Sequence, residues 1–260
     1  MLDKDIYLNH IHDNEVQFKM KRLLDQIQSS MKNHSIITTD FFDPYERKTA
    51  ESILNRFQEL SYFYDGGMEK AERKCILIYP EYVYEKDLPS AVAYLRIDGQ
   101  LDDLTHKDYL GAVLGLGITR EKIGDILLYG DFTLIIVKRE IKDYILLNFE
   151  KAGKQNITIS EVDGEDIEYP EMDFVEISKF VSSLRLDSYL SAAYNISRSE
   201  SRALIKSENV KVNWGMTAKA DQTLDAGDVV SVRGKGRTVL HEIGGMSKKG
   251  RINLKIRKLV

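Results

Sequence analysis

The residues best suited to bind a polyanion lie near the C-terminus of the sequence. Arg198, Arg202 and Lys206 recur at intervals of four, so a helix would bring them to one face. Ser197 precedes them and Glu200 follows three residues later, the spacing of a capping box that starts a helix. The N-terminus of such a helix adds partial positive charge and N–H donors. We interpret this segment as a phosphate-binding surface, with a merely solvated helix face as the alternative.

Neighbouring segments must position these cations. An apolar stripe from Leu186 to Ala193 predicts a preceding helix, with Arg185 at its start. Residues 210–213 and 229–232 are predicted to be strands. The Arg-Gly-Lys-Gly-Arg segment at 233–237 is predicted to be a loop whose glycines let the backbone approach phosphates. The candidate RNA-binding residues are Arg185, Arg198, Arg202, Lys206, Lys211, Asn213, Trp214, Arg233, Lys235 and Arg237. Trp214 can stack on RNA or pack in the core, and the sequence favours neither.

Charge is distributed unevenly along the 260 residues. The whole chain has a formal charge of −4, but residues 181–260 contain 15 Lys and Arg against 7 Asp and Glu, a charge of +8. The other 180 residues carry −12. A basic part joined to an acidic body indicates a polyanionic partner for that end. An uneven surface without a partner is the alternative.

Composition indicates an ordinary globular protein, with 43% hydrophobic and 30% charged residues. The single cysteine, Cys75, excludes a disulfide framework. Apolar runs such as 134–137 are far shorter than the ~20 residues that span a membrane, and the first ten residues lack an apolar signal region. We expect a soluble, cytoplasmic, monomeric protein with no membrane partner.

Three regions are predicted along the chain. Residues 1–73 are predicted to be helical, because apolar residues repeat at helical spacing after Val16 and again from Ile53 to Tyr62. Residues 74–165 alternate as ββαββαβ, beginning with strands at 75–80 and 91–97, and predict an α+β sandwich with helices on one face. An acidic linker is predicted at 163–176. The basic domain at 181–260 is expected to begin with two short helices and end in strands.

The C-terminal motifs resemble the S4 RNA-binding domain, also called the alpha-L RNA-binding motif. The matching segments are 185–190 (RLDSYL), 197–199 (SRS), Arg202, 210–213 (VKVN) and 227–233 (GDVVSVR). The resemblance covers about 182–240 and implies that this region binds RNA. Glu208 stands where many such domains have glycine, so we expect Asn209 to supply the left-handed residue of that turn.

Motifs elsewhere resemble the YlmH family, bacterial three-part proteins that end in this domain. They are 42–44 (FDP), 65–67 (DGG), 71–74 (AERK), 114–118 (LGLGI) and 120–126 (REKIGDI). The resemblance implies a helical N-terminal part, a middle domain like an RNA-recognition or ferredoxin-like sandwich, and ribosomal RNA as the target. Small relatives with the S4 domain bind the large ribosomal subunit carrying a stranded peptidyl-tRNA, in ribosome-associated quality control.

Catalytic, metal-binding, cofactor-binding and base-stacking interpretations of other residues are less well supported than structural ones. Asp187 follows Arg-Leu as in pseudouridine synthases, but it lies in the predicted helix of the binding domain, so we interpret it as structural, paired with an arginine. The five histidines show no metal-ligand spacing with Cys75, and the 111–117 glycines follow no strand, so neither a metal site nor a cofactor is predicted. Tyrosines at 79, 82, 84 and 94 are expected to pack rather than stack on bases, because the basic strand motif of RNA-recognition domains is missing.

Three function classes remain open. The preferred one is a noncatalytic factor that binds ribosomal RNA on the large subunit, with peptidyl-tRNA. The second is an RNA-modifying or tRNA-acting enzyme whose site lies in the middle domain, for example at Asp125 or Asp131. The third is an adaptor whose acidic N-terminal region binds protein. In the first class, the acidic body makes only limited RNA contacts, through residues such as Arg73, Lys74, Arg120 and Lys122.

Overall fold

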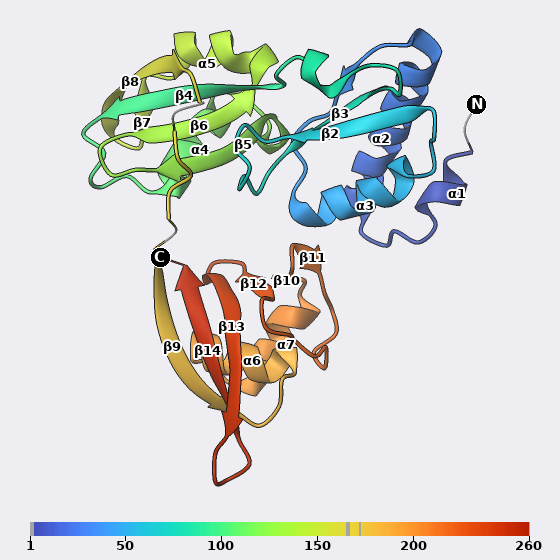
Figure 1. Cartoon of the computed structure of the whole chain (residues 1–260). Coiled ribbons are helices and arrows are strands. Elements are labelled where there is room, and N and C mark those ends of the chain that lie inside the picture. The colour runs from blue at the N-terminus through green and yellow to red at the C-terminus, as the bar shows by residue number, and fades with distance from the viewer. Residues whose placement is uncertain (1–2, 165–166, 172, 260) are drawn as a thin grey trace. The chain divides into compact units, whose positions relative to one another are not determined.

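The computed structural model describes residues 3–164, 167–171 and 173–259. The chain divides into two compact units, Met1–Pro170 and Glu171–Val260 (Figure 1). Each unit has its own hydrophobic core. Among the helices of the described residues, none is long and apolar enough to span a bilayer.

The N-terminal part of the first unit packs helices on a small sheet. The helices are α1 (Asp5–Leu8), α2 (Asn14–Asn33) and α3 (Pro44–Leu54), and the strands β1 (Ile37–Thr38), β2 (Leu60–Asp65) and β3 (Cys75–Pro80) pair in the order β1-β3-β2. Asp43 caps α3 in a full capping box with Glu46. The helical prediction for 1–73 holds for α2 and α3, but it is wrong at 60–65. There the alternating LSYFYD segment pairs along β3 instead of continuing a helix.

The middle part is built on a second sheet. Its elements are η1 (Glu85–Asp87), β4 (Val92–Gly99), α4 (His106–Gly115), η2 (Arg120–Lys122), β5 (Ile123–Leu128), β6 (Thr133–Lys138), η3 (Arg139–Ile141), α5 (Lys142–Asn148), β7 (Lys151–Ala152) and β8 (Gln155–Val162). The sheet order is β5-β6-β4-β8-β7 with antiparallel pairs. Without the two-residue strand β7, the elements follow the order βαββαβ, and the strands lie side by side as β8, β4, β6 and β5. This is the ferredoxin-like arrangement, as expected.

One predicted strand belongs to the other sheet. Residues 75–80 were expected in the middle sandwich, yet β3 pairs only with β1 and β2 among the described strands. Alternate residues of β3 belong to two different hydrophobic cores. Ile76 and Ile78 pack with the N-terminal helices. Leu77, on the other face of the strand, packs with Leu134 and Ile136 of the middle sheet. A fully apolar strand of this kind gives no sequence signal for the sheet that it joins.

The C-terminal unit is a six-stranded antiparallel sheet with two helices. Its elements are β9 (Phe174–Val181), α6 (Leu186–Tyr194), α7 (Arg198–Lys206), β10 (Val210–Val212), β11 (Gly215–Met216), β12 (Val229–Val232), β13 (Gly236–Met246) and β14 (Ile252–Leu259), in the sheet order β11-β10-β12-β13-β14-β9. The two predicted helices are confirmed. The prediction of a linker up to 176 is wrong at its end, because β9 begins at Phe174 and pairs along β14.

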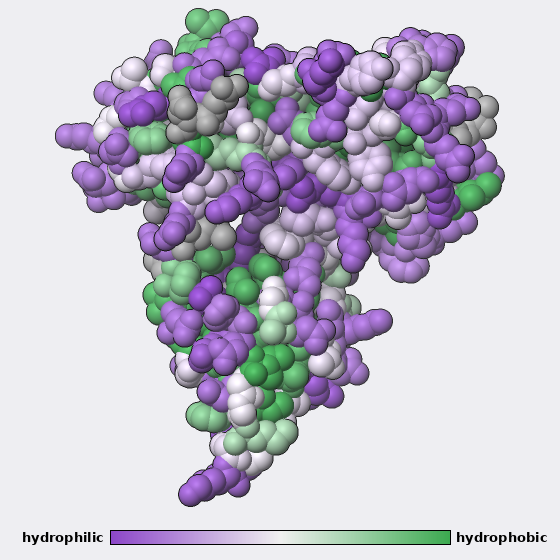
Figure 2. All heavy atoms as spheres, viewed as in Figure 1, coloured by the Kyte–Doolittle hydropathy of each residue, from purple (hydrophilic) through white to green (hydrophobic). Residues whose placement is uncertain are grey.

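The surface of this unit is mixed in character. Figure 2 shows hydrophobic residues gathered over its sheet, while the tip of the β13–β14 hairpin is hydrophilic. Exposed apolar side chains of the sheet include Phe174, Val175, Phe180 and Met246. The core beneath the helices is closed by Leu186, Tyr189 and Leu190 from α6 and by alternate residues of the strands.

Candidate nucleic-acid interface

Three arginines converge on one buried carboxylate at the start of α6. Asp187 is 0% exposed, and its oxygens lie 3.2 Å from Arg185 Nε, 2.9 Å from Arg202 Nε and 3.7 Å from Arg198 Nη2. The arginine side chains remain 42%, 58% and 48% exposed, respectively. The interpretation of Asp187 as a structural partner of an arginine is therefore confirmed, and the arginines keep about half of their surface for a ligand.

The electrostatics of this cluster favour an anion. Burial alone raises the pKa of Asp187, but hydrogen bonds from Arg185 and Arg202 and the charge of Arg198 outweigh it, so the pKa lies below the ordinary value. One carboxylate then faces three guanidinium groups, which leaves a local excess of positive charge. Each guanidinium is a planar fork of N–H donors suited to phosphate oxygens. The cluster therefore combines the positive charge and the oriented N–H donors that phosphate binding requires.

The cations of helix α7 lie on one exposed face, as their four-residue spacing predicts. It begins at Arg198, and Arg198, Arg202 and Lys206 are all exposed, while Ser201 and Ile205 are buried. Only half of the predicted capping box is seen: Ser197 Oγ accepts the N–H of Glu200 at 3.1 Å. The Glu200 carboxylate instead lies 3.4 Å from Lys235 Nζ. This ion pair brings the loop between β12 and β13 beside the first turn of α7.

Two tyrosines of α6 fix that loop in place. The Tyr189 hydroxyl donates to Thr238 Oγ1 at 3.0 Å, deep in the core. The Tyr194 hydroxyl contacts the carbonyl oxygens of Gly236, at 3.0 Å, and Val230, at 3.2 Å. The predicted loop 233–237 is shorter than expected, because Gly236 already begins β13. The strand ends that carry Arg233 and Lys235 are thus anchored to the arginine-bearing helices.

The structure divides the predicted RNA-binding residues between two faces of the sheet. Val210, Val212 and Thr238 point into the core beneath the helices. Because strand side chains alternate, Lys211 and Arg237 lie on the opposite face. Arg185, Arg198, Arg202 and Lys206 form one group, here called the helix face. Lys211, Trp214 and Arg237 form another, here called the sheet face.

Asn213 has a positioning role within the domain. Its Nδ2 donates to Asp228 Oδ1 at 2.8 Å, and its Oδ1 accepts the N–H of Val229 at 2.9 Å. The side chain therefore ties the β10–β11 turn to the start of β12. The turn after α7 corrects another expectation: Glu208 itself is left-handed, with φ 56°, whereas Asn209 was expected to be. The carbonyl of Leu204 accepts the N–H of Asn209, which keeps that residue in the helix-ending turn.

The open sheet face through which RNA-recognition domains stack bases is covered in this chain. Leu134 and Ile136 lie on the face of the middle sheet away from α4 and α5, and they are buried against Phe41, Leu77 and other N-terminal residues. Tyr79 is buried there as well, and Tyr94 donates a hydrogen bond to the Gly67 carbonyl. These two tyrosines pack as expected, while Tyr82 and Tyr84 are exposed outside the strands.

Basic residues of the acidic body are engaged within the protein. Arg73 donates to the carbonyls of Phe41 and Ile123, both at 3.1 Å, and Arg120 donates to those of Ile123 and Gly124. Lys122 lies 2.7 Å from Asp40 and 2.5 Å from Glu140. These contacts do not support the prediction that such cations reach RNA. The sequence gave no sign of these partners, because they are backbone carbonyls for the two arginines and carboxylates distant in the chain for Lys122.

Asp125, a candidate catalytic acid of the enzyme alternative, is also structural in its contacts. It is buried, and it accepts the N–H groups of Glu72 at 2.6 Å and Arg73 at 3.1 Å. Burial raises its pKa, although those backbone hydrogen bonds and one from Tyr169 act in the opposite direction. The carboxylate holds the segment before β3 against β5.

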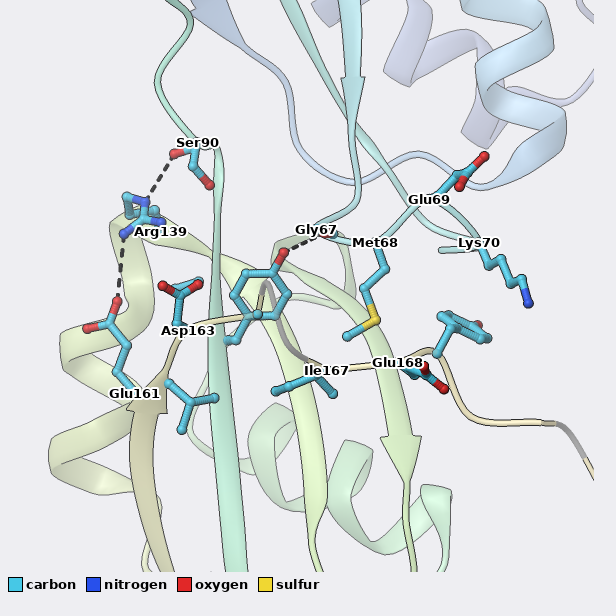
Figure 3. A pocket seen from close by; sticks show the side chains of 15 residues that line it. Gly67, Met68, Glu69, Lys70, Ser90, Arg139, Glu161, Asp163, Ile167 and Glu168 are labelled. Atoms are coloured by element: carbon cyan, nitrogen blue, oxygen red, sulfur yellow. Dashed lines mark hydrogen bonds and ion pairs between the residues drawn. The ribbon is translucent and has the colours of Figure 1, made fainter. Parts of the chain in front are cut away.

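The first unit also contains an open cleft of about 1140 Å³ beside β4 and β8. Figure 3 shows Arg139 and Glu161 on one side, with Met68 toward the middle, and Tyr94 also lines the cleft. Glu161 lies 2.6 Å from Lys142 and 3.6 Å from Arg139. Arg139 also donates to the carbonyls of Ser90 and Val92. The charged groups of this wall are therefore engaged with one another and with the backbone.

Comparisons with known proteins agree with this three-part organisation. Family models match at residues 15–83 (YlmH, N-terminal), 85–166 (putative RNA-binding domain in YlmH) and 184–230 (S4 domain). The chain is 30% identical over 247 residues to the ribosome-associated protein quality control protein P2 of Bacillus subtilis (strain 168), covering 94% of this chain and 95% of that protein. The structure of the cell division protein ylmH from Streptococcus pneumoniae has the same fold over 60% of this chain and 96% of its own, with a TM-score of 0.53 at 20% identity.

Proposed function

The chain belongs to the YlmH family, and from this we propose that it is a noncatalytic, monomeric cytoplasmic factor that binds ribosomal RNA on the large ribosomal subunit carrying peptidyl-tRNA. The Bacillus subtilis relative is named as a ribosome-associated quality control protein, which supports this partner. Quality control of stalled translation is the corresponding process.

The helix face carries this proposal. Arg185 and Arg202 are hydrogen-bonded to a buried carboxylate, so their guanidinium groups are oriented before RNA arrives. Preorganised donors lose less conformational entropy on binding than free side chains do. Helix α7 and the anchored loop carry Arg198, Arg202 and Lys206 together with Arg233 and Lys235, enough cations to contact several phosphates of a structured RNA. Such binding depends on placed cations and on shape, and it requires no activated nucleophile.

The salt dependence of RNA affinity tests the proposal. Arg198 lies 3.7 Å from Asp187 without a hydrogen bond, and Lys206 is exposed, so Arg198→Ala with Lys206→Ala leaves the Arg185 and Arg202 contacts intact. The logarithm of the RNA affinity falls linearly with the logarithm of the salt concentration, and each lost phosphate contact makes this slope shallower by ~0.7–0.9. For a structured ribosomal RNA fragment, we expect the slope of the double variant to be shallower than that of the wild type by ~1.5. A control pair, Lys32→Ala with Lys48→Ala, removes two exposed lysines of the first unit.

The control pair should leave the slope unchanged. A folded Arg198/Lys206 variant whose affinity and slope equal those of the wild type would show that α7 is only a solvated helix face.

A further inference from the structure

The sharpest anomaly in the C-terminal unit is the residue at the tip of the β10–β11 hairpin. Val212 pairs with Gly215, so Asn213 and Trp214 form a two-residue loop. Both are left-handed, with φ 49° and 65°, as in a type I′ turn. The second position of such turns strongly prefers glycine, because a side chain there is strained. A tryptophan therefore occupies a position where the backbone favours glycine.

The indole lies beside a row of polar residues across the sheet. Arg237 Cζ lies 5.3 Å from the centroid of the Trp214 ring, a cation–π contact. Ser231 is paired with Lys211 on one side and Arg237 on the other. Because neighbouring strands lie ~4.8 Å apart, the two cations stand ~10 Å from each other on one face. Trp214, Lys211 and Arg237 are all partly exposed.

The remainder of the sheet face carries cations in ion pairs and also two exposed aromatic side chains of β9, Phe174 and Phe180. Farther along it, Arg257 lies 3.6 Å from Glu176, and Lys255 lies 2.6 Å from Glu242. These two cations alternate along β14 with buried Leu254 and Ile256, so they point to the same side as Arg237. Arg257 Cζ also lies 4.2 Å from the centroid of the Phe174 ring, so both ends of the face place a cation beside an aromatic ring, and the end at the β10–β11 hairpin differs in that its ring is an indole.

We propose that Trp214, Arg237 and Lys211 form a stacking site for an unpaired nucleotide of RNA. This inference rests on the proposed RNA-binding function and adds a second contact on the face of the sheet opposite the helix face. An indole stacks on any base, but duplex RNA hides its bases, so the site selects single-stranded RNA. Arg237 supports the ring, and Lys211 supplies a charge for the adjoining phosphate. One small domain then contacts two RNA segments, one by shape and phosphate charge, the other by stacking.

Intrinsic fluorescence reads this site directly, because Trp214 is the only tryptophan in the chain. We expect a single-stranded oligouridine or oligoadenosine of eight nucleotides to quench the emission of the full-length protein to saturation. A blunt duplex of the same length should quench it far less. The Arg198→Ala, Lys206→Ala variant should be quenched by the single strand as the wild type is, even though it loses affinity for structured ribosomal RNA.

Substitution at the turn separates binding from folding. Trp214→Gly places the favoured residue at a left-handed position, so the thermal midpoint should stay the same or rise. Its affinity for the single strand, measured by anisotropy of labelled RNA, should fall by at least ~5-fold, since a stacked base contributes ~1–3 kcal/mol. Trp214→Phe should retain part of the binding. Lys211→Gln with Arg237→Gln should weaken it, and the matched pair Lys255→Gln with Arg257→Gln should not.

Two results would overturn the stacking site. One is unchanged tryptophan emission when labelled single-stranded RNA is seen to bind. The other is a folded Trp214→Gly variant with wild-type affinity for the single strand. Both are independent of the salt slope measured with structured RNA, so failure of this site and failure of the helix face are distinguishable.

Discussion

Asp187 organises the helix face although it would itself repel RNA. Its buried carboxylate orients arginines from two helices, so the guanidinium groups present fixed donors to solvent. The four-residue spacing of Arg198 and Arg202, and the place of Arg185 before an apolar helical stripe, are visible in the sequence. It also suggested a structural aspartate, but the convergence of three arginines on it depends on how α6 packs on α7.

Replacing Asp187 by asparagine should weaken RNA binding even though it makes the protein more basic. The charge-assisted hydrogen bonds from Arg185 and Arg202 would be lost, which costs about 2 kcal/mol of unfolding free energy. Without their anchor the arginines lose their shared orientation, and we expect RNA affinity to fall several-fold at neutral pH. Chemical denaturation and RNA titration measure the two effects. The control Asp221→Asn, at an exposed position of the same unit, should lower neither the unfolding free energy nor the RNA affinity.

The same residue predicts an acid-sensitive term in stability. The pKa of Asp187 is lowered in the folded protein, so the folded state binds its proton less readily than the unfolded chain does. The stabilisation is therefore fully present above the unfolded value of ~3.9 and is lost as pH falls through the lower folded pKa. The difference in unfolding free energy between wild type and Asp187→Asn should be constant from pH 7 to 5 and shrink below about pH 4. A difference that stayed constant down to pH 3 would contradict this assignment.

At the scale of elements, the turn after α7 contains local strain. Glu208 is left-handed at φ 56°, where glycine is unstrained. We expect Glu208→Gly to raise the unfolding free energy by ~0.5–1 kcal/mol, offset in part by the flexibility of glycine in the unfolded chain. Glu208→Ala should bring no such gain, because alanine keeps the Cβ atom. Equal stabilisation by both variants in denaturant melts would assign the effect to the lost charge.

The two sheets of the first unit should fold as one. Leu134 and Ile136 of the middle sheet are fully buried against N-terminal residues, which include Leu77 and Phe41. A fragment of residues 85–170 would expose this apolar face, and we expect it to aggregate or to lack dispersed amide signals. The fragment 1–170 should be folded by the same spectra. A well-folded 85–170 fragment would show that the shared core contributes little.

Most helices and strands were predictable, because their apolar periodicity and their caps are local signals. The wrong predictions concern segments whose secondary structure depends on pairing with a strand distant in the sequence. The strand at 60–65 depends on β3, and β9 depends on β14, which is some 80 residues away in the chain. The division of the candidate residues into a helix face and a sheet face could not be predicted either, because it follows from strand pairing and alternation.

At the scale of the molecule, the two units have opposite charge. Residues 171–260 contain 16 Lys and Arg against 10 Asp and Glu, a charge of +6, and residues 1–170 carry −10. We expect the fragment 171–260, which has its own core, to bind RNA at least as tightly as the full chain but with less preference for large-subunit RNA. Like charges oppose docking on wrong RNA. Competition with unrelated RNA measures this, and equal selectivity of fragment and full chain would refute a discriminating role for the acidic unit.

The most direct test of the central claim is co-sedimentation with purified ribosomal subunits. At low salt, the wild-type protein should pellet with large subunits and not with small ones, and high salt should release it. The Arg198→Ala, Lys206→Ala variant should remain largely in the supernatant under the same low-salt conditions, while the Lys32→Ala, Lys48→Ala control pellets as the wild type does. Binding of the folded Arg198/Lys206 variant at the wild-type level, or a preference of the wild type for small subunits, would contradict the account.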